Sequence, residues 1–161
     1  MLASNLGNYA ELFEKDLVYA EFLPMFFKFC SDNVARVSNA VCNALCPILL
    51  QFNEDENKQT SIVRIVKNRY CKAKTFKKRQ LFVQMCGGQM MQQKELFEKY
   101  FKLDFLLIAN DRVQNVRIGM AKILRQHFLK EISGAFVFDQ EMNDAVNVLK
   151  LDSCEDVRAL V

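Results

Sequence analysis

The sequence contains little glycine and proline and no long apolar run, and each shortage excludes a class of protein. Five Gly and two Pro among 161 residues are too few for a turn-rich sheet, while half of the chain is apolar. We therefore predict long helices. The longest apolar run, 44–50, contains Pro47 and is much shorter than the roughly 20 residues that cross a membrane. Because no basic and apolar signal segment opens the chain, we expect no membrane association.

Catalytic and metal-binding patterns are also missing. The single histidine, His127, has no serine or cysteine at a catalytic-triad spacing, and no phosphate-binding glycine loop is present. The six cysteines form no CxxC pair, and Cys42 and Cys46 share a helix face without a third metal ligand nearby. We therefore expect no enzymatic activity, cofactor or metal. Free thiols that pack as small apolar groups indicate a cytoplasmic, or also nuclear, protein.

The sequence does contain a repeated pattern, a short polar turn followed by an apolar helix. In the clearest copy, Ile108–Gln126, Asp111 lies in the turn, where a helix N-cap is expected. The apolar residues that follow at helical spacing are Val113, Val116, Met120, Ile123 and Leu124. Similar segments begin at Asp32, 79 residues earlier, and at Asp152, 41 residues later. A period near 40 residues with two helices per unit is typical of HEAT and armadillo solenoids.

We therefore predict an all-α HEAT-repeat solenoid of antiparallel helix pairs that forms a single domain over residues 1–161. About three full repeats lie between partial ones, and the approximate units are 1–15 (partial), 16–55, 56–93, 94–135 and 136–161 (partial). The turn of the third unit, Ala73-Lys74-Thr75, is a degenerate copy. Because both ends hold partial units, we expect a fragment of a longer scaffold.

Local signals predict details of these units. Pro24 is expected to bend its helix, Gly87-Gly88 to end another, and Ser133-Gly134 to end the helix that begins near Arg112. Within the helix that begins at Lys94, two acid–base pairs lie four residues apart and are expected to form ion pairs. These pairs are Glu95–Lys99 and Glu98–Lys102.

An acid and an arginine recur at one spacing. Asp111 and Arg117, six residues apart, reappear as Asp152 and Arg158, whereas Ser38 stands six residues after the aspartate of the second unit. We predict that each aspartate caps its turn and that each arginine bonds to an acid of the neighbouring repeat. These residues would then fix how the repeats stack.

Basic residues concentrate in the third unit. Residues 57–94 carry ten basic and no acidic side chains, between acidic flanks. Around the turn these are Arg64, Lys67, Lys72, Lys74, Lys77, Lys78 and Arg79. Such a block is suited to an acidic protein surface or to nucleic acid phosphates, or it is simply solvated. Because no base-reading helix is evident, we favour protein contact and do not expect nucleic acid binding.

Three segments resemble one family. DRVQNVRIGMAKILRQ (Asp111–Gln126) resembles HEAT repeats of protein phosphatase scaffold subunits. DAVNVLKLDSCEDVR (Asp144–Arg158) is similar to the C-terminal repeats of regulatory subunits of serine/threonine protein phosphatase 4, and FLPMFFKFCSDNVARV (Phe22–Val37) is similar to the same group. The resemblance implies a non-catalytic scaffold whose intra-repeat turns dock the phosphatase catalytic subunit or its substrates.

Carried to this sequence, the resemblance implies three protein-binding turns. Their residues are Asp32, Asn33 and Arg36, then Lys74, Lys77 and Lys78, then Asp111, Arg112 and Asn115. Two alternatives stay open. One is another HEAT adaptor, such as a nuclear transport or assembly factor, and the other is a nucleic-acid-binding helical-repeat protein that uses the basic block of residues 57–94.

Overall fold

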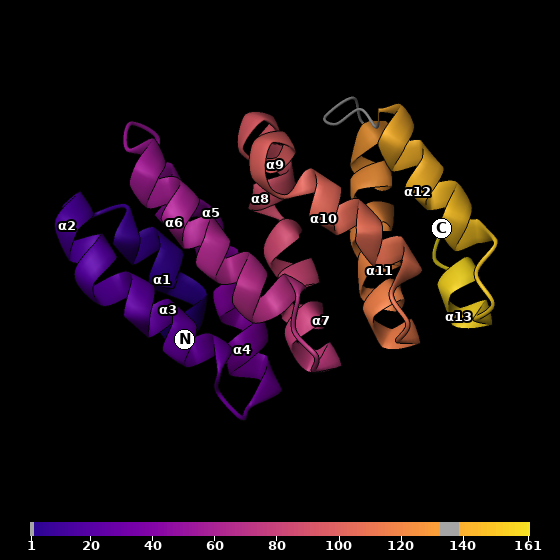
Figure 1. Cartoon of the computed structure of the whole chain (residues 1–161), viewed down its shortest axis with the longest axis horizontal. Helices are drawn as coiled ribbons and strands as arrows, with labels where there is room; N and C mark the ends of the chain where they lie inside the picture. Colours follow the sequence, from indigo (N-terminus) through magenta and orange to yellow (C-terminus); the bar gives the residue numbers. More distant parts are fainter. Residues whose placement is uncertain (1, 133–138) are drawn as a thin grey trace.

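The chain folds into helices that follow one another in a row, from α1 at one end to α12 and α13 at the other (Figure 1). The computed structural model describes residues 2–132 and 139–161, with the backbone alone for 128–132. Every regular element in these ranges is helical, and the ranges contain no strand. The predicted all-α class is therefore confirmed. The predicted helix end at Ser133-Gly134 and the unit boundary at 135/136 lie outside the described residues.

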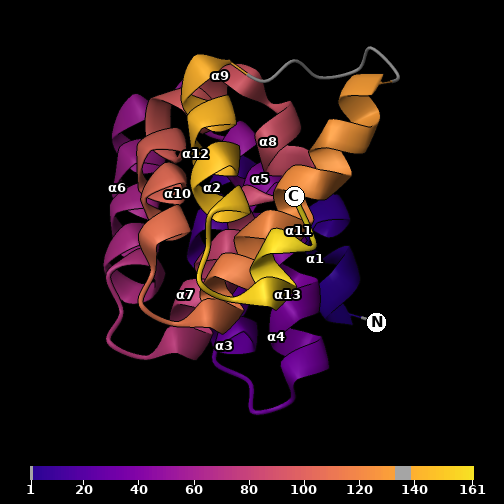
Figure 2. The ribbon, with the colours of Figure 1, turned by 90° about the vertical axis from the view of Figure 1, so that its right-hand side faces the viewer.

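The helices form two layers, which Figure 2 shows in a view along the row. The first layer contains α2 (Lys15–Leu17), a π-helical turn (Val18–Phe22), α3 (Leu23–Cys30), α6 (Glu56–Val66), a second π-helical turn (Lys67–Cys71), α9 (Lys94–Tyr100), α10 (Lys102–Leu107), a 3₁₀ turn (Ile108–Asn110) and α12 (Gln140–Lys150). The second layer contains α1 (Leu2–Ala10), α4 (Ala35–Val41), a 3₁₀ turn (Cys42–Ala44), α5 (Leu45–Leu50), α7 (Phe76–Cys86), α8 (Gln89–Gln92), α11 (Gln114–Ile132) and α13 (Glu155–Arg158). Within the second layer, α1 packs on α4 and α5, α7 on α11, and α11 on α13.

Two of the irregular helical turns lie shortly before a proline. The π-helical turn Val18–Phe22 lies directly ahead of Pro24, and the 3₁₀ turn Cys42–Ala44 lies ahead of Pro47. Proline has no N–H to give to the preceding turn, so the helix must adjust its hydrogen bonds there. As predicted, Gly87-Gly88 ends a helix, because α7 stops at Cys86 and Gly88 has a positive φ of 56°.

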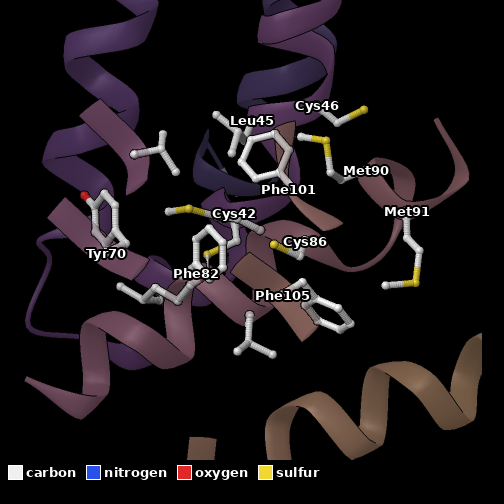
Figure 3. Packing of buried hydrophobic residues seen from close by; sticks show 14 of the residues in the cluster. Cys42, Leu45, Cys46, Tyr70, Phe82, Cys86, Met90, Met91, Phe101 and Phe105 are labelled. Atoms are coloured by element: carbon white, nitrogen blue, oxygen red, sulfur yellow. Dashed lines mark hydrogen bonds between the residues drawn. The ribbon is translucent and has the colours of Figure 1, made fainter. Parts of the chain in front are cut away.

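Aromatic and sulfur-containing side chains fill the space between the layers (Figure 3). Phe82, Phe101 and Phe105 are fully buried there, beside the thiols of Cys42 and Cys86. All six cysteines of the chain are free thiols. Burial raises the pKa of Cys86, so this thiol is neutral near pH 7 and packs as an apolar group.

Most ion pairs join residues of different helices and turns, and the pair Lys94–Glu98 within α9, at 4.0 Å, is an exception. The two pairs predicted within a single helix are wrong. Phe101, with a φ of −120°, divides that helix into α9 and α10 and so separates Glu98 from Lys102. Glu95 and Lys99 both lie in α9, but Lys99 pairs elsewhere. Lys99 instead lies 2.7 Å from Glu56 of α6. Lys102 lies 2.5 Å from Asp139 at the start of α12. These exposed or partly exposed pairs set register more than they add stability.

Candidate interaction surface along the turns

Three turns that join the layers share one local geometry. In each, the aspartate Oδ1 accepts the backbone N–H of the residue two positions later, at 2.8–2.9 Å. These pairs are Asp32–Val34, Asp111–Val113 and Asp152–Cys154. The arrangement is an Asx turn ahead of the helix. The aspartates thus close their turns, but those of the second and fifth turns do not occupy helix N-cap positions, because the N-caps of α4 and α13 are the later residues Val34 and Cys154.

Two buried arginines bind the aspartate of the following turn with a two-bond fork. Arg79 donates Nε to Asp111 Oδ2 at 2.6 Å and Nη2 to Oδ1 at 3.0 Å. Arg117 donates Nε to Asp152 Oδ2 at 2.5 Å and Nη2 to Oδ1 at 2.8 Å. The side chains are 9% and 7% exposed in the first pair and 13% and 5% in the second. A guanidinium forms this planar double contact where a lysine would make a single bond.

The remaining guanidinium nitrogen secures the arginine to its own turn. Arg117 and Arg158 donate Nη1 to the carbonyl six residues earlier, at 2.7 and 2.6 Å. Arg79 does the same to Ala73, at 2.8 Å, and also reaches the Lys74 carbonyl at 3.0 Å. Each arginine thus holds its own turn closed. We call the connected residues the Arg–Asp ladder, and its members are Arg79, Asp111, Arg117, Asp152 and Arg158.

The ladder includes Arg79, which the sequence analysis placed in the basic block around the third turn, for which it favoured protein contact. The six-residue Asp–Arg spacing that marked Arg117 and Arg158 does not occur at Arg79, because Ala73 stands where the aspartate would be. The corresponding arginine place in the second unit is held by Ser38. An Arg–Asp pair between the second and third units would need an arginine at position 38 and an aspartate at position 73, and the sequence has neither. A buried arginine or aspartate without its partner would destabilise the fold, so the loss of both residues is less destabilising than the loss of one.

The ladder lowers the pKa values of its carboxyls. Burial alone would raise the pKa of Asp111, but the hydrogen bonds from Arg79 and from the Val113 N–H outweigh it and bring the pKa below its usual value. The hydrogen bond from Arg117 has the same effect on the pKa of Asp152. Both carboxylates are ionised at neutral pH, and their charges are offset by the arginines.

The residues proposed for protein binding lie around this ladder. Lys74, Lys77 and Lys78 are exposed, and no ion pair joins them to the described residues. Arg112 is exposed and donates Nη2 to the Lys74 carbonyl at 3.4 Å. The Asn115 carbonyl accepts a hydrogen bond of 3.1 Å from Gln80 Nε2. The third and fourth turns are thus tied together, with their cations directed outward.

The first predicted turn lies beyond this connected pair. Asp32, Asn33 and Arg36 are exposed between α3 and α4. Two members of the basic block are not available to a partner, since Lys67 lies 2.7 Å from Asp104 and Arg79 belongs to the ladder. The structure therefore brings the basic turn and the turn at Arg112 together, and leaves the Asp32 turn as a separate exposed site.

A shallow hollow of about 360 Å³ lies between the fourth and fifth turns. Arg112 and Asn110 line one wall, and Val148 and Leu151 line the other. Leu151 is 86% exposed, which is unusual for a leucine. The sequence did not identify this hollow because it forms only where two units meet. The turn edge thus combines cations with exposed apolar groups.

The described parts of the chain were compared with the patterns expected for a metal centre and for a membrane span. Residues 2–132 and 139–161 contain no group of three or more His, Cys, Asp or Glu positioned to hold a metal ion, and no helix there is long and apolar enough to cross a membrane. His127 is buried in α11, at 1% exposure. A scan against protein-family models finds no matching family, and a search of curated proteins finds no match.

Proposed function

We propose that the chain is a segment of a HEAT-repeat solenoid that acts as a non-catalytic scaffold and binds a protein partner along its turns. The Arg–Asp ladder supports this proposal. It repeats at successive turns with the same atoms bonded, as expected for stacked copies of one unit. Interlocked turns form a rigid edge, and a rigid edge lowers the entropic cost of binding.

The charged side chains outside the Arg–Asp ladder indicate which charge the partner's surface carries. Asp111 and Asp152 are neutralised by arginines, while Lys74, Lys77 and Lys78 have no ion pair with described residues. The edge is therefore net positive and suits an acidic protein surface. The exposed Leu151 beside it favours a protein over nucleic acid phosphates, because a phosphate backbone offers no apolar contact.

The resemblance to phosphatase scaffolds supplies the identity of the proposed partner. We infer that the partner is the catalytic subunit of a serine/threonine phosphatase of the phosphatase 4 type, or substrates that the scaffold presents to it. The chain would hold the catalytic subunit or its substrates in position, and the catalytic subunit would supply all of the chemistry.

Binding of the purified phosphatase 4 catalytic subunit to the immobilised chain tests this proposal. We expect the triple variant Lys74→Glu, Lys77→Glu, Lys78→Glu to weaken binding by about ten-fold or more, since rim charges control association. The matched control reverses three exposed cations that the structure places on helices α6, α9 and α11, away from the turn edge: Arg64, Lys94 and Lys122. It changes the net charge equally and should alter the dissociation constant by less than about three-fold.

Three outcomes would overturn the proposal. The first is a wild-type chain that does not bind the catalytic subunit. The second is an equal loss in the turn variant and in the control, which would indicate a non-specific charge effect. The third is salt-sensitive binding of duplex DNA or RNA that the turn variant abolishes, which would assign the same lysines to nucleic acid.

A further inference from the structure

A second surface lies away from the turns, on the face of the first layer between α3 and α6, which are side by side in Figure 1. It is a groove of about 550 Å³. Leu23, Pro24 and Ile65 form its aliphatic lining, and Lys28 and Arg69 are its charged lining residues. An apolar concavity with a few convergent charges is the usual form of a binding site.

Both walls of the groove contain a π-helical turn. Tyr19 belongs to the turn Val18–Phe22, and Arg69 belongs to the turn Lys67–Cys71. Pro24 accounts for the first turn, but no proline follows the second. π-Helical turns are rare, and they occur frequently at functional sites because they redirect side chains. Here the two turns, from neighbouring units, direct Tyr19 and Arg69 into one groove.

The aromatic faces in the groove are already covered. The Arg69 guanidinium lies 4.9 Å from the centre of the Phe27 ring, and Tyr70 stacks on Phe27 at 6.4 Å with an interplanar angle of 9°. The Lys58 ammonium lies 5.5 Å from the centre of the Tyr19 ring. A nucleobase needs a free aromatic face on which to stack. The open apolar surface is instead aliphatic and suits an inserted side chain.

The charge at the rim has one sign. Lys28 and Arg69 are both exposed, and no acidic residue lines the groove. An occupant must therefore bring negative charge beside its apolar part. We propose that this groove binds a short segment of a partner protein in which one large aliphatic or aromatic side chain adjoins a carboxylate. The apolar side chain enters between Leu23 and Ile65, and the carboxylate meets Arg69.

This site is independent of the proposed phosphatase scaffold role. The groove is formed by the bodies of two helices, whereas the Arg–Asp ladder and its lysines belong to the turns. A segment bound here would leave the turn edge free, so the chain could hold two proteins at once. The test below uses neither the phosphatase nor the turn residues.

Selection from a phage-displayed library of random seven-residue peptides on the immobilised full chain tests the proposal. We expect enriched peptides to carry an aliphatic or aromatic residue within two positions of an aspartate or glutamate. Fluorescence polarisation of one enriched peptide then gives the dissociation constant. Arg69→Glu should raise this constant at least ten-fold, and Lys28→Glu should raise it as well. The matched control Arg64→Glu, an exposed arginine of the same helix outside the groove, should leave it unchanged.

Thermal unfolding followed by circular dichroism checks each variant, and Arg69→Gln serves as a second variant should the charge reversal disturb the helix. The proposal fails if no peptides are enriched, if the enriched peptides lack acids, or if Arg64→Glu weakens binding as much as Arg69→Glu. It also fails if a single-stranded RNA oligonucleotide binds the chain and loses affinity on Arg69→Glu, because the groove would then be a nucleic acid site.

Discussion

The Arg79–Asp111 pair offers the sharpest test of how the helical units are joined. Both side chains are more than nine-tenths buried, and together they connect two turns through two hydrogen bonds. We consider the variants Arg79→Ala and Asp111→Ala, singly and combined. In each single variant one charged group keeps its burial and loses its partner, which is the expensive way to break an ion pair.

The expected cost follows from the bonds that each variant removes. Arg79→Ala removes the fork and also the bonds to the carbonyls of Ala73 and Lys74. Asp111→Ala removes the fork and the acceptor of the Val113 N–H. Each single variant should lower the free energy of unfolding by about 3 kcal/mol, at the low end of the range for buried pairs. The double variant should cost about 4 kcal/mol, because the fork is lost only once, which gives a coupling energy of about 2 kcal/mol.

Urea unfolding followed by circular dichroism at 222 nm measures these values. With a slope of about 2 kcal/mol per molar urea, each single variant should shift the midpoint by about 1.5 M. Lys77→Ala and Lys78→Ala, exposed residues of the same helix, should shift it by less than about 0.3 M. Costs below about 0.5 kcal/mol in both single variants, or strictly additive costs, would refute the structural role of the ladder.

Two further predictions concern stability. Because the folded pKa of Asp111 and of Asp152 is lowered, their contribution is complete above the unfolded value near 3.9 and is lost as the pH falls through the folded value. The stability gap between wild type and the variant Asp111→Asn, Asp152→Asn, measured by urea unfolding, should therefore hold above about pH 4 and narrow as the pH falls below it, and a gap that stays constant down to low pH would contradict this linkage. Gly7→Ala should cost about 1–3 kcal/mol although alanine favours helices, since its Cβ would lie 2.5 Å from Pro47 Cγ in α5; an unchanged or higher melting temperature would show that α1 does not pack there.

Hydrophobic spacing and turn residues were sufficient to predict where most helices lie. The apolar periodicity after Asp111 predicted α11, and the glycines at 87 and 88 predicted the end of α7. Local signals did not predict the break at Phe101, because it depends on how α9 and α10 pack and not on a helix-breaking residue. The predicted intra-helix ion pairs failed because Lys99 and Lys102 reach acids of other helices instead.

The candidate surface was predictable only in part. The six-residue spacing of Asp111 and Arg117 identified a real structural unit, but the aspartate was assigned an N-cap role when it forms an Asx turn. Arg79 was assigned to the basic block and not to the ladder, because its own turn has Ala73 where the others have aspartate. The groove beside Arg69 could not be foreseen, since it requires α3 and α6, which are separated in the sequence by α4 and α5, and a π-helical turn that no local signal marks.

The central claim, that the basic turn edge receives a protein partner, is tested most directly by lysine footprinting. The chain is acetylated with and without the purified phosphatase 4 catalytic subunit, and the modification of each lysine is quantified by mass spectrometry. We predict at least five-fold protection of Lys74, Lys77 and Lys78 in the complex, with Lys94 and Lys122 unchanged. Unprotected turn lysines in a formed complex, equal protection of Lys122, or the absence of a complex would contradict the claim.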